Sequence, residues 1–464
     1  MKDALIWDHD LIARYNTSGP RYTSYPTVVQ FSEDFHQQSY LSSALRSTAQ
    51  ARSLSLYVHI PFCTNICYFC ACNKIITKHH KQADHYLQAL FRDIDMQADL
   101  YSPRQEVEQL HFGGGSPTFL NDAQLKAIID KIASRFQLSR SDESDYSIEI
   151  DPRDIDWPRM ANLCNLGFNR ISLGVQDINE KVQKAVNRIQ SEALIQSIVD
   201  AARTMAFKSI HMDLIYGLPF QTPDSFSETL DCILAMEPDR LSLFNYAHLP
   251  RRFMPQRRIH EADLPSAQEK LEILQQSTET LLQKGYVYIG MDHFALPDDQ
   301  LAIAQENGAL HRNFQGYTTH RHCDLIGLGL SAISHVGSVY SQNYTDENRY
   351  QQAVENNELP IWRGLKMSQD DQIRHDVINE MICHFRLNPE VIEKKFSINF
   401  SRYFSSELRQ LNIMVQDNLL TLSKSNTIKV TDKGRLFIRN ICMVFDRYLA
   451  TPTQQAKPLF SKVI

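Results

Sequence analysis

The sequence predicts an α/β fold, a partial barrel of six βα units with an extension at each end. Short runs rich in β-branched and aromatic residues recur through the middle of the chain. Amphipathic stretches separate these runs, with apolar residues every three or four positions. This alternation is typical of parallel strands joined by crossover helices, and six units are fewer than the eight of a closed TIM-like barrel.

Six segments are expected to form the parallel strands: 53–60, 107–114, 145–151, 169–175, 207–215 and 239–247. The clearest helical periodicity between them covers 83–100 and 194–207. We expect three parts of the chain. An N-terminal segment (1–52) closes over the site, the barrel occupies 53–365, and a mostly helical domain occupies 366–464.

The C-terminal part has its own pattern. Helices are expected at 369–384, 388–396 and 402–414, then two short strands around a polar turn within 419–430, then a helix over 434–449. This order is typical of a winged-helix-like unit. Residues 366–464 hold 15 basic and 10 acidic side chains, so a DNA-binding surface is the alternative to a packing or lid domain.

The amino-acid composition excludes some classes of function. The 464 residues include 48 basic and 54 acidic side chains, a net charge of −6, which argues against nucleic-acid binding through a strongly basic surface. Asp8, His9 and Asp10 interrupt the apolar positions of the N-terminus, and no apolar run reaches membrane-spanning length. We therefore expect a cytoplasmic protein with no membrane and no nucleic-acid partner.

Chemically useful residues occur where the expected strands end. They are Tyr57 and His59, Gly113 to Gly115, Glu149 and Asp151, Gln176, and Asp213. Because a barrel builds its site at the carboxyl ends of its parallel strands, this series favours one shared site over separate buried polar residues.

Four of the nine cysteines fall within ten residues, and Cys63, Cys67 and Cys70 form C-x3-C-x2-C. Three thiolates on a short loop can ligate three irons of a 4Fe–4S cluster and leave the fourth iron open. A structural zinc site is the alternative, but it normally uses four ligands in two pairs, and only Cys72 is close enough to be a fourth. The spacing favours the cluster.

The segment HFGGGSPT (111–118) places three of the sixteen glycines together. It is neither a dinucleotide-binding G-x-G-x-x-G nor a P-loop. Glycines allow a backbone to approach a ligand closely, so the segment is either a cofactor clamp or a tight turn.

The cysteine loop followed by a glycine-rich strand end resembles the radical S-adenosylmethionine enzymes. Further motifs resemble one branch, the oxygen-independent coproporphyrinogen III oxidases, over nearly the whole chain. They are GPRYTSYPT (19–27), LYVHIPFCTNICYFCACNK (56–74), IEIDPR (148–153), NRISLGVQD (169–177), GMDHFALPDD (290–299) and LHRNFQGYTT (310–319).

The resemblance implies anaerobic oxidative decarboxylation of two propionates of coproporphyrinogen III to vinyl groups, giving protoporphyrinogen IX. It implies a 4Fe–4S cluster and two S-adenosylmethionine molecules, whose cleavage yields a 5′-deoxyadenosyl radical. A reductant such as a flavodoxin-like protein and a monomeric chain are also expected.

Carried over by motif, Cys63, Cys67 and Cys70 are the expected cluster ligands, and Cys72 matches a family cysteine that is not a required ligand. Tyr57 and His59 are the candidate catalytic residues. For His59 the open alternatives are a hydrogen bond near the cluster, proton transfer, or a buried core position. The expected cofactor contacts are Tyr57, Phe69, Gly114, Gly115, Ser116 (where the family usually has Thr), Glu149, Gln176, Arg188, Asp213, Ala247, Gln315 and Ile333.

Charge matching suggests Arg14, Arg21 and Lys74 as groups that attract the substrate's carboxylates. A haem chaperone of related fold is the alternative function. Such relatives typically lack the YTSYP segment (22–26) and the C-x-C-N of Cys70 to Asn73, which this chain has. A radical enzyme acting on another substrate is the third possibility.

Overall fold

The structure is a computed structural model that describes residues 5–449. The chain forms two compact units. Of the described residues, unit 1 contains 5–30, 275–321 and 367–449. Unit 2 contains Phe31–Leu274 and His322–Lys366. The three-part division drawn from the sequence stays a prediction, and its N-terminal segment is shared between the two units.

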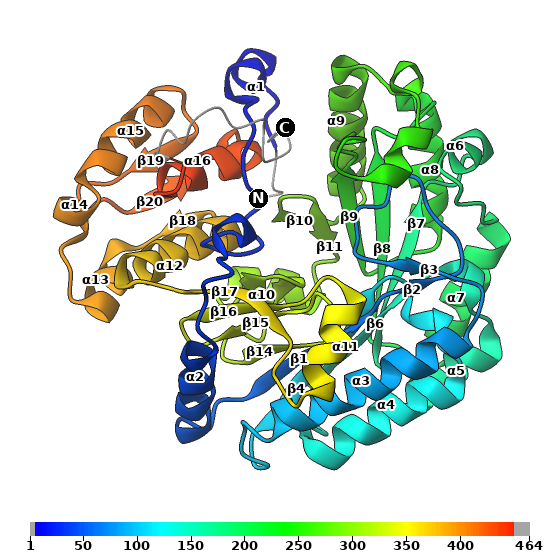
Figure 1. Ribbon diagram of the computed structural model, residues 1–464. Coiled ribbons are helices and arrows are strands. Elements are labelled where there is room, and N and C mark those ends of the chain that lie inside the picture. Colours follow the sequence, from blue (N-terminus) through cyan, green and yellow to red (C-terminus); the bar gives the residue numbers. More distant parts are fainter. Residues whose placement is uncertain (1–4, 450–464) are drawn as a thin grey trace. The chain divides into compact units, whose positions relative to one another are not determined.

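Unit 2 contains the six predicted strands, all parallel and side by side in chain order, so the expected partial barrel is confirmed (Figure 1). They are β1 (Leu54–Ile60), β4 (Glu106–Gly114), β6 (Asp145–Ile150), β7 (Arg170–Gln176), β8 (Ser209–Tyr216) and β9 (Arg240–Asn245).

Burial along the strands identifies the face that carries the site. In β6, β7 and β8 fully buried residues alternate with half-buried ones, and the half-buried positions include Glu149, Gln176 and Asp213. Strand β1 is buried at every position except Tyr57. Because successive side chains of a strand point to opposite faces, these half-buried residues share the face away from the covering helices.

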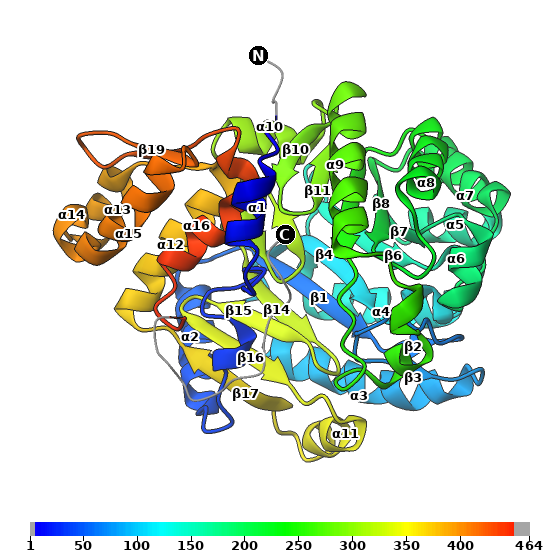
Figure 2. The same ribbon diagram turned by 90° about the horizontal axis from the view of Figure 1, so that it is seen from above.

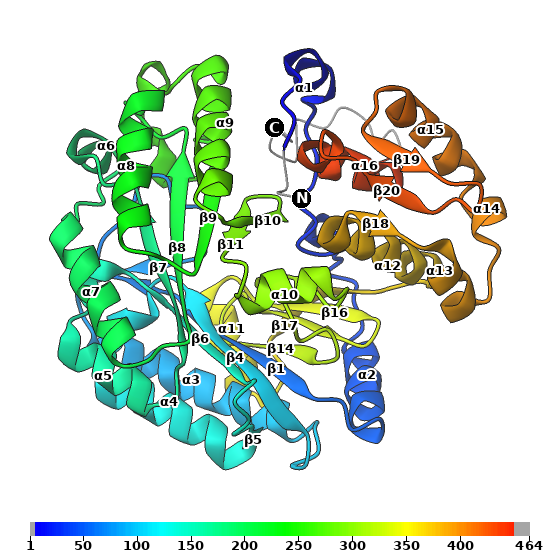
Figure 3. The same ribbon diagram turned by 180° about the vertical axis from the view of Figure 1, so that it is seen from behind.

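Five main helices cover the outer face of the strands (Figures 1 and 3). They are α3 (Lys81–Ala98), α4 (Asp122–Arg135), α5 (Trp157–Asn165), α7 (Glu192–Thr204) and α8 (Pro223–Ala235), with the short α6 (Glu180–Ala185) before α7. Local sequence fixes several helix starts: Asn121 caps the N-terminus of α4 and Thr222 caps that of α8, each in a reciprocal capping box. The sequence placed α3 and α7 within two or three residues of these limits.

Unit 2 continues the sheet on the other side of β1, which the sequence did not predict. β14 (Asp324–Leu328) pairs with β1 in parallel, and β15 (Ile333–Val336), β16 (Val339–Asn343) and β17 (Ile361–Lys366) follow as an antiparallel meander (Figure 2). Helix α2 (Gln37–Ala49) contacts β15 and β16, and α11 (Glu347–Glu355) contacts α3.

Unit 1 holds the predicted C-terminal helices as α12 (Gln369–His384), α13 (Pro389–Phe396), α14 (Phe400–Tyr403) and α15 (Ser405–Gln416). The predicted hairpin is β19 (Leu420–Leu422) with β20 (Ile428–Val430), and β18 (Arg386–Leu387) adds a third strand. The last helix is shorter than predicted, a 3-10 turn at Gly434–Phe437 followed by α16 (Ile438–Val444). These elements fit the expected helical, wing-bearing domain.

The remaining elements of unit 1 come from two other stretches of chain. They include α1 (His9–Tyr15), β10 (Val287–Gly290), β11 (His293–Ala295), α10 (Gln300–Glu306), β12 (His311–Asn313) and β13 (Gly316–Thr318). Residues near α1 lie against α16: Arg439 donates to Pro20 O at 3.0 Å, and Tyr22 Oη donates to Asp446 at 3.0 Å. Within residues 5–449, no helix has the length and apolar composition needed to cross a membrane.

Candidate active site at the carboxyl ends of the strands

The three motif cysteines lie on one loop that follows β1 and is closed at its base. Two short strands, β2 (Phe62–Cys63) and β3 (Ile75–Ile76), pair in parallel across the ends of the loop. Ile75 N donates to Pro61 O at 2.7 Å, and Thr77 N donates to Cys63 O at 3.1 Å. The loop between these strands therefore carries the remaining motif thiols from a fixed base.

The thiols of this loop have unequal acidities. Burial raises the pKa of Cys63 to about 12, and the neighbouring Cys70 and Cys67 add to the shift. A hydrogen bond from Cys72 holds the pKa of Cys70 below its usual value, and the Lys74 ammonium acts in the same direction. Lys74 Nζ also donates to Cys70 O and Cys72 O, each at 3.2 Å. A cationic metal centre would be ligated by these thiols in their thiolate form.

The glycine loop at the end of β4 packs directly on the base of the cysteine loop. Gly115 N donates to Ile60 O and Ser116 N donates to Phe62 O, both at 2.8 Å. A Cβ on Gly114, whose φ is +115°, would lie 2.5 Å from the His59 ring, and a Cβ on Gly115 would lie 2.6 Å from Phe62 O. Only glycine fits at these two positions.

Tyr57 and His59 form a hydrogen-bonded chain from β1 to the end of the cysteine loop. His59 Nε2 lies 3.2 Å from Asn73 O, and His59 Nδ1 lies 3.1 Å from Tyr57 Oη. Since a carbonyl can only accept, Nε2 carries the proton and Nδ1 accepts from the tyrosine hydroxyl. Burial lowers the pKa of His59 to about 4, so the imidazole is neutral near pH 7. Both ring nitrogens of His59 are therefore engaged in hydrogen bonds.

Glu149 is held at the end of β6 by two donors from β4. Gly114 N donates to Glu149 Oε2 at 3.1 Å, and His111 Nε2 lies 3.3 Å from Oε1. Burial works to raise the pKa of Glu149, but the His111 and Gly114 contacts outweigh it and hold that pKa below its usual value. His111 is itself placed by Ser147 Oγ at 2.8 Å and by the Tyr57 ring stacked on it at 5.8 Å. The side chain of Glu149 is 43% exposed, so its anionic carboxylate is available to a ligand.

Further polar groups lie at the ends of the next three strands. Gln176 has a left-handed φ of +70° beside a shift in register between β7 and β8, and its Oε1 is buried without a hydrogen-bond partner. Asn245 Oδ1, at the end of β9, is likewise buried and unpartnered. Asp213 accepts from Ser172 Oγ at 2.9 Å and lies 3.5 Å from His211 Nε2. Two buried acceptors without partners, at the same end of the strands as the two carboxylates, fit a ligand that brings its own donors.

Arg188 lies beside one of the thiols. Its Nη1 donates to Asp151 Oδ2 at 3.0 Å and to Cys67 Sγ at 3.5 Å, and its Nε donates to Gly174 O at 3.0 Å. The Ser116 hydroxyl lies 3.1 Å from Thr118 Oγ1 and donates to Asp154 Oδ2 at 3.3 Å.

The other predicted cofactor contacts occupy three different settings. Phe69 packs against the apolar cluster that includes Val182 and Tyr246. Ala247 follows Tyr246 in the chain and is half-buried. Ile333 begins β15 and lies against Gly327, which pairs with Tyr57 across β1 and β14. Gln315 is in the turn between β12 and β13 of unit 1, where both atoms of its amide are buried without a partner. The structure thus brings all the predicted residues except Gln315 onto unit 2.

Three residues of this region were not assigned a role from the sequence: His111, Arg153 and Asn245. His111 opens the glycine motif and Arg153 ends IEIDPR, so both had a local signal. Their roles depend on partners 38 and 86 residues away, Glu149 and Cys67, which only the fold brings together.

The groups predicted to attract substrate carboxylates have partners within their own units. Arg14 Nη1 lies 2.7 Å from Asp417, and Arg21 Nη1 lies 2.9 Å from Asp292. Lys74 donates to the carbonyls of the cysteine loop. Their role toward a substrate stays a prediction.

The donor set fits the two cofactors that the sequence motifs suggest. Three thiols on one loop are the ligand type that iron–sulfur clusters use. The adjacent glycines leave room for a close ligand, and the unpaired acceptors Gln176 and Asn245 suit the ammonium and hydroxyl donors of S-adenosylmethionine.

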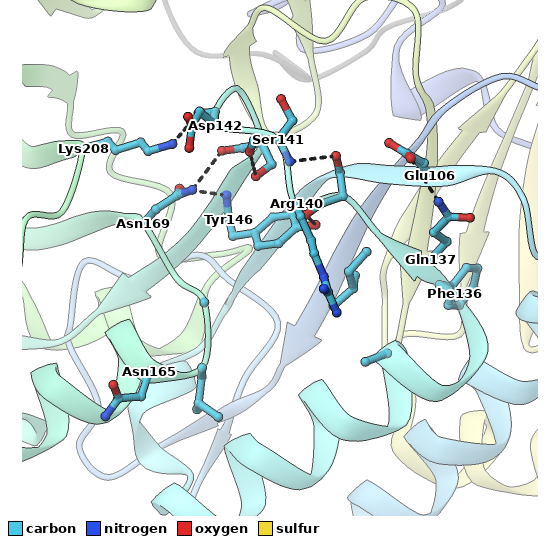
Figure 4. A pocket seen from close by; sticks show the side chains of 16 residues that line it. Glu106, Phe136, Gln137, Arg140, Ser141, Asp142, Tyr146, Asn165, Asn169 and Lys208 are labelled. Carbon is cyan, nitrogen blue, oxygen red and sulfur yellow. Dashed lines mark hydrogen bonds between the residues drawn. The ribbon is translucent and has the colours of Figure 1, made fainter.

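A hollow of about 1010 Å³ lies at the opposite, amino ends of the strands (Figure 4). Its polar lining is largely paired with itself. Asn169 Nδ2 donates to Ser144 O at 2.9 Å, and Tyr146 Oη lies 2.9 Å from Val107 O and 2.8 Å from Ser139 O. Lys208 Nζ donates to Asp142 O. Despite its volume, this hollow therefore has few polar groups left to bind a ligand.

Comparisons with known proteins agree with the chemistry of the carboxyl-end site. Residues 57–233 match the radical SAM superfamily. The oxygen-independent coproporphyrinogen III oxidase of Pseudomonas aeruginosa is 55% identical over 464 residues, 100% of either chain. Its Escherichia coli counterpart is 50% identical over 458 residues, 99% of this chain and 98% of that protein.

A solved structure gives the same result. Coproporphyrinogen III oxidase from Escherichia coli, a radical SAM enzyme, superposes with a TM-score of 0.91 at 48% sequence identity. The match covers 96% of this chain and 100% of that one. The chain therefore belongs to the oxygen-independent coproporphyrinogen III oxidase family of radical SAM enzymes.

Proposed function

We propose that the chain converts coproporphyrinogen III to protoporphyrinogen IX without oxygen, by oxidative decarboxylation of two propionate side chains to vinyl groups. The observation that carries this proposal is the convergence of three loop thiols, a side-chain-free glycine loop and anionic Glu149 at one end of the barrel strands. The family relationship supports the choice of substrate.

Each part of the site has a distinct task in this proposal. Cys63, Cys67 and Cys70 hold one 4Fe–4S cluster. Glu149, Gln176, Arg188 and Asp213, with the backbone of Gly114 and Gly115, bind S-adenosylmethionine, and we expect two molecules of it. When bound, these cofactors would supply the radical chemistry that removes a hydrogen atom from the propionate β-carbon; carbon dioxide would then leave and one electron would pass to an external acceptor, which leaves the vinyl group.

Tyr57 and His59 act as positioning residues rather than as proton carriers. The neutral His59 accepts from Tyr57 and donates to Asn73 O, so it ties β1 to the last residues of the cysteine loop. Burial keeps the pKa of Tyr57 well above its usual value, so its hydroxyl keeps its proton. Phe69 and its apolar neighbours exclude water from the loop.

A direct test is an anaerobic assay of the holoprotein with a one-electron reductant, such as a flavodoxin-like protein, and S-adenosylmethionine. The substrate carries deuterium at the propionate β-carbons. We expect two 5′-deoxyadenosines for each protoporphyrinogen IX, each one mass unit heavier than in the unlabelled reaction, together with two molecules of carbon dioxide.

A reaction without S-adenosylmethionine is the control and should give none of these products. Tight haem binding with no release of carbon dioxide would instead favour a haem chaperone. Formation of 5′-deoxyadenosine without deuterium would mean that the radical acts on another position or another substrate.

A further inference from the structure

Two arginines direct N–H groups at the sulfur of a single motif cysteine. Arg153 Nη2 lies 3.7 Å from Cys67 Sγ, and Arg188 Nη1 lies 3.5 Å from it. Cys67 is 8% exposed and Arg188 is 7% exposed, so this contact is shielded from water. Since shielding strengthens interactions with charged donors, two guanidinium groups are a strong local field for one thiol.

Asp151 holds both guanidinium groups in place. Its Oδ2 accepts from Arg153 Nη2 at 2.6 Å and from Arg188 Nη1 at 3.0 Å, and its Oδ1 accepts from Arg153 Nε at 2.9 Å. Burial works to raise the pKa of Asp151, but Arg188 and Arg153 outweigh it and keep the carboxyl ionised. One carboxylate thus bridges two cations that would otherwise repel each other.

Local backbone structure explains why these groups meet. Asp151 follows β6 and caps a 3-10 turn, Pro152–Asp154, by accepting from Arg153 N at 3.1 Å. The proline fixes the first position of this turn, so Asp151 and Arg153 share one rigid corner. Arg188 is anchored on the other side by Gly174 O of β7.

The residues on either side of Cys67 are tied to the segment that carries Arg188. Asn187 Nδ2 donates to Ile66 O at 2.7 Å, and Tyr68 N donates to Val186 O at 3.0 Å. Cys67 is therefore fixed through its neighbours' backbone as well as through its sulfur. The N–H···S contacts are therefore held in place by hydrogen bonds on both sides of Cys67, and they do not depend on exposed side chains.

We propose that Asp151 positions Arg153 and Arg188 as hydrogen-bond donors to Cys67, and that Arg153 in this way raises the reduction potential of the cluster bound there. The inference rests on the proposed function, which places a cluster on Cys67. Reduction adds negative charge to a cluster and its sulfurs, so donors and positive charge next to a ligand sulfur stabilise the reduced state. Arg153 is a positioning residue, since it acts through Cys67.

The test compares the reduction potentials of the cluster in the wild-type protein and in Arg153→Gln, Arg153→Lys and Arg140→Gln. All are loaded anaerobically, checked for iron and sulfide content, and titrated by electron paramagnetic resonance without S-adenosylmethionine. Arg140 is exposed at the other end of the strands, so Arg140→Gln removes one positive charge far from the cysteine loop.

In Arg153→Gln we expect the ratio of reduced to oxidised cluster at a fixed potential to fall about tenfold, a shift of ~59 mV for one electron. Arg153→Lys should recover part of that shift, and Arg140→Gln should match the wild type. Fully loaded Arg153→Gln protein with the wild-type potential would overturn the inference. If Arg153→Gln does not hold a cluster, Arg153→Lys decides by the same criterion. A wild-type protein that binds no cluster would instead refute the proposed function.

Discussion

The two ends of the same parallel strands carry very different chemistry. At the carboxyl ends, three loop thiols, Glu149 and the unpaired Gln176 Oε1 lie beside glycines that admit no side chain. At the amino ends, a hollow of about 1010 Å³ is lined by polar groups that largely bond to one another. Volume does not distinguish a functional site here; free ligand atoms and pre-positioned charge do.

The strongest test of this difference between the two ends of the strands is to remove one thiol at the carboxyl ends. We expect Cys67→Ser to lose the cluster's visible absorbance and all decarboxylase activity, because a serine hydroxyl does not replace a thiolate ligand. Cys164→Ser is the matched control, since the Cys164 thiol bonds only to the carbonyl of Met205 at 3.6 Å. Absorbance and turnover that survive in Cys67→Ser would show that Cys67 is not a ligand.

Removing the charge of Glu149 should have the next largest effect. Glu149→Gln keeps the size of the side chain but removes the anion that His111 and Gly114 N orient. We expect the KM for S-adenosylmethionine to rise roughly tenfold to a hundredfold, as for loss of a hydrogen bond to a charged group. Glu143→Gln, at the exposed amino-end loop, is the control and should leave this KM unchanged. Equal KM values in the two variants would count against Glu149 as a cofactor ligand.

A pH effect on stability should come from His59. Its folded-state pKa, about 4, lies below the usual 6.5, so between these values the unfolded chain binds more protons than the folded one. Its contribution is fully present above pH 6.5 and is lost as the pH falls, by about 2 kcal/mol between pH 7 and pH 5.

Urea unfolding at both pH values measures this contribution. The loss of stability on acidification should be smaller in His59→Asn than in the wild type, whereas the exposed variant His85→Asn should behave like the wild type. An unchanged pH dependence in His59→Asn would mean that this buried ring is not neutral in the fold.

The smallest effect is expected at the amino-end hollow. Tyr146→Phe removes a hydroxyl that lies within hydrogen-bond distance of Val107 O and Ser139 O. It should cost about 1 kcal/mol of unfolding free energy and leave the KM for S-adenosylmethionine and the turnover rate as in the wild type. A large loss of activity with unchanged stability would show that the amino ends take part in the reaction after all.

The sequence predicted the parts of the molecule whose signal is local. The six strands follow apolar runs, and the C-x3-C-x2-C loop and the glycine triplet are contiguous motifs. It missed the β14–β17 extension, which returns to pair with β1 about 270 residues later in the chain, at Leu54 with Asp324. It also missed how His111 and Arg153 act. The partner of His111 across the sheet depends on strand register, and the partner of Arg153 depends on how two loops at the carboxyl ends of the strands meet, and no single segment specifies either.

The two-residue pairing of β2 with β3 has a consequence for rebuilding a damaged cluster. It closes the cysteine loop with protein hydrogen bonds alone, at Pro61 O and Cys63 O, so the entropy of closing the loop is already lost when the chain folds. We therefore expect the base of the loop to stay closed in a protein whose cluster has been destroyed by air. Reloading it should require iron, sulfide and a reductant, and no denaturation or chaperone-assisted refolding.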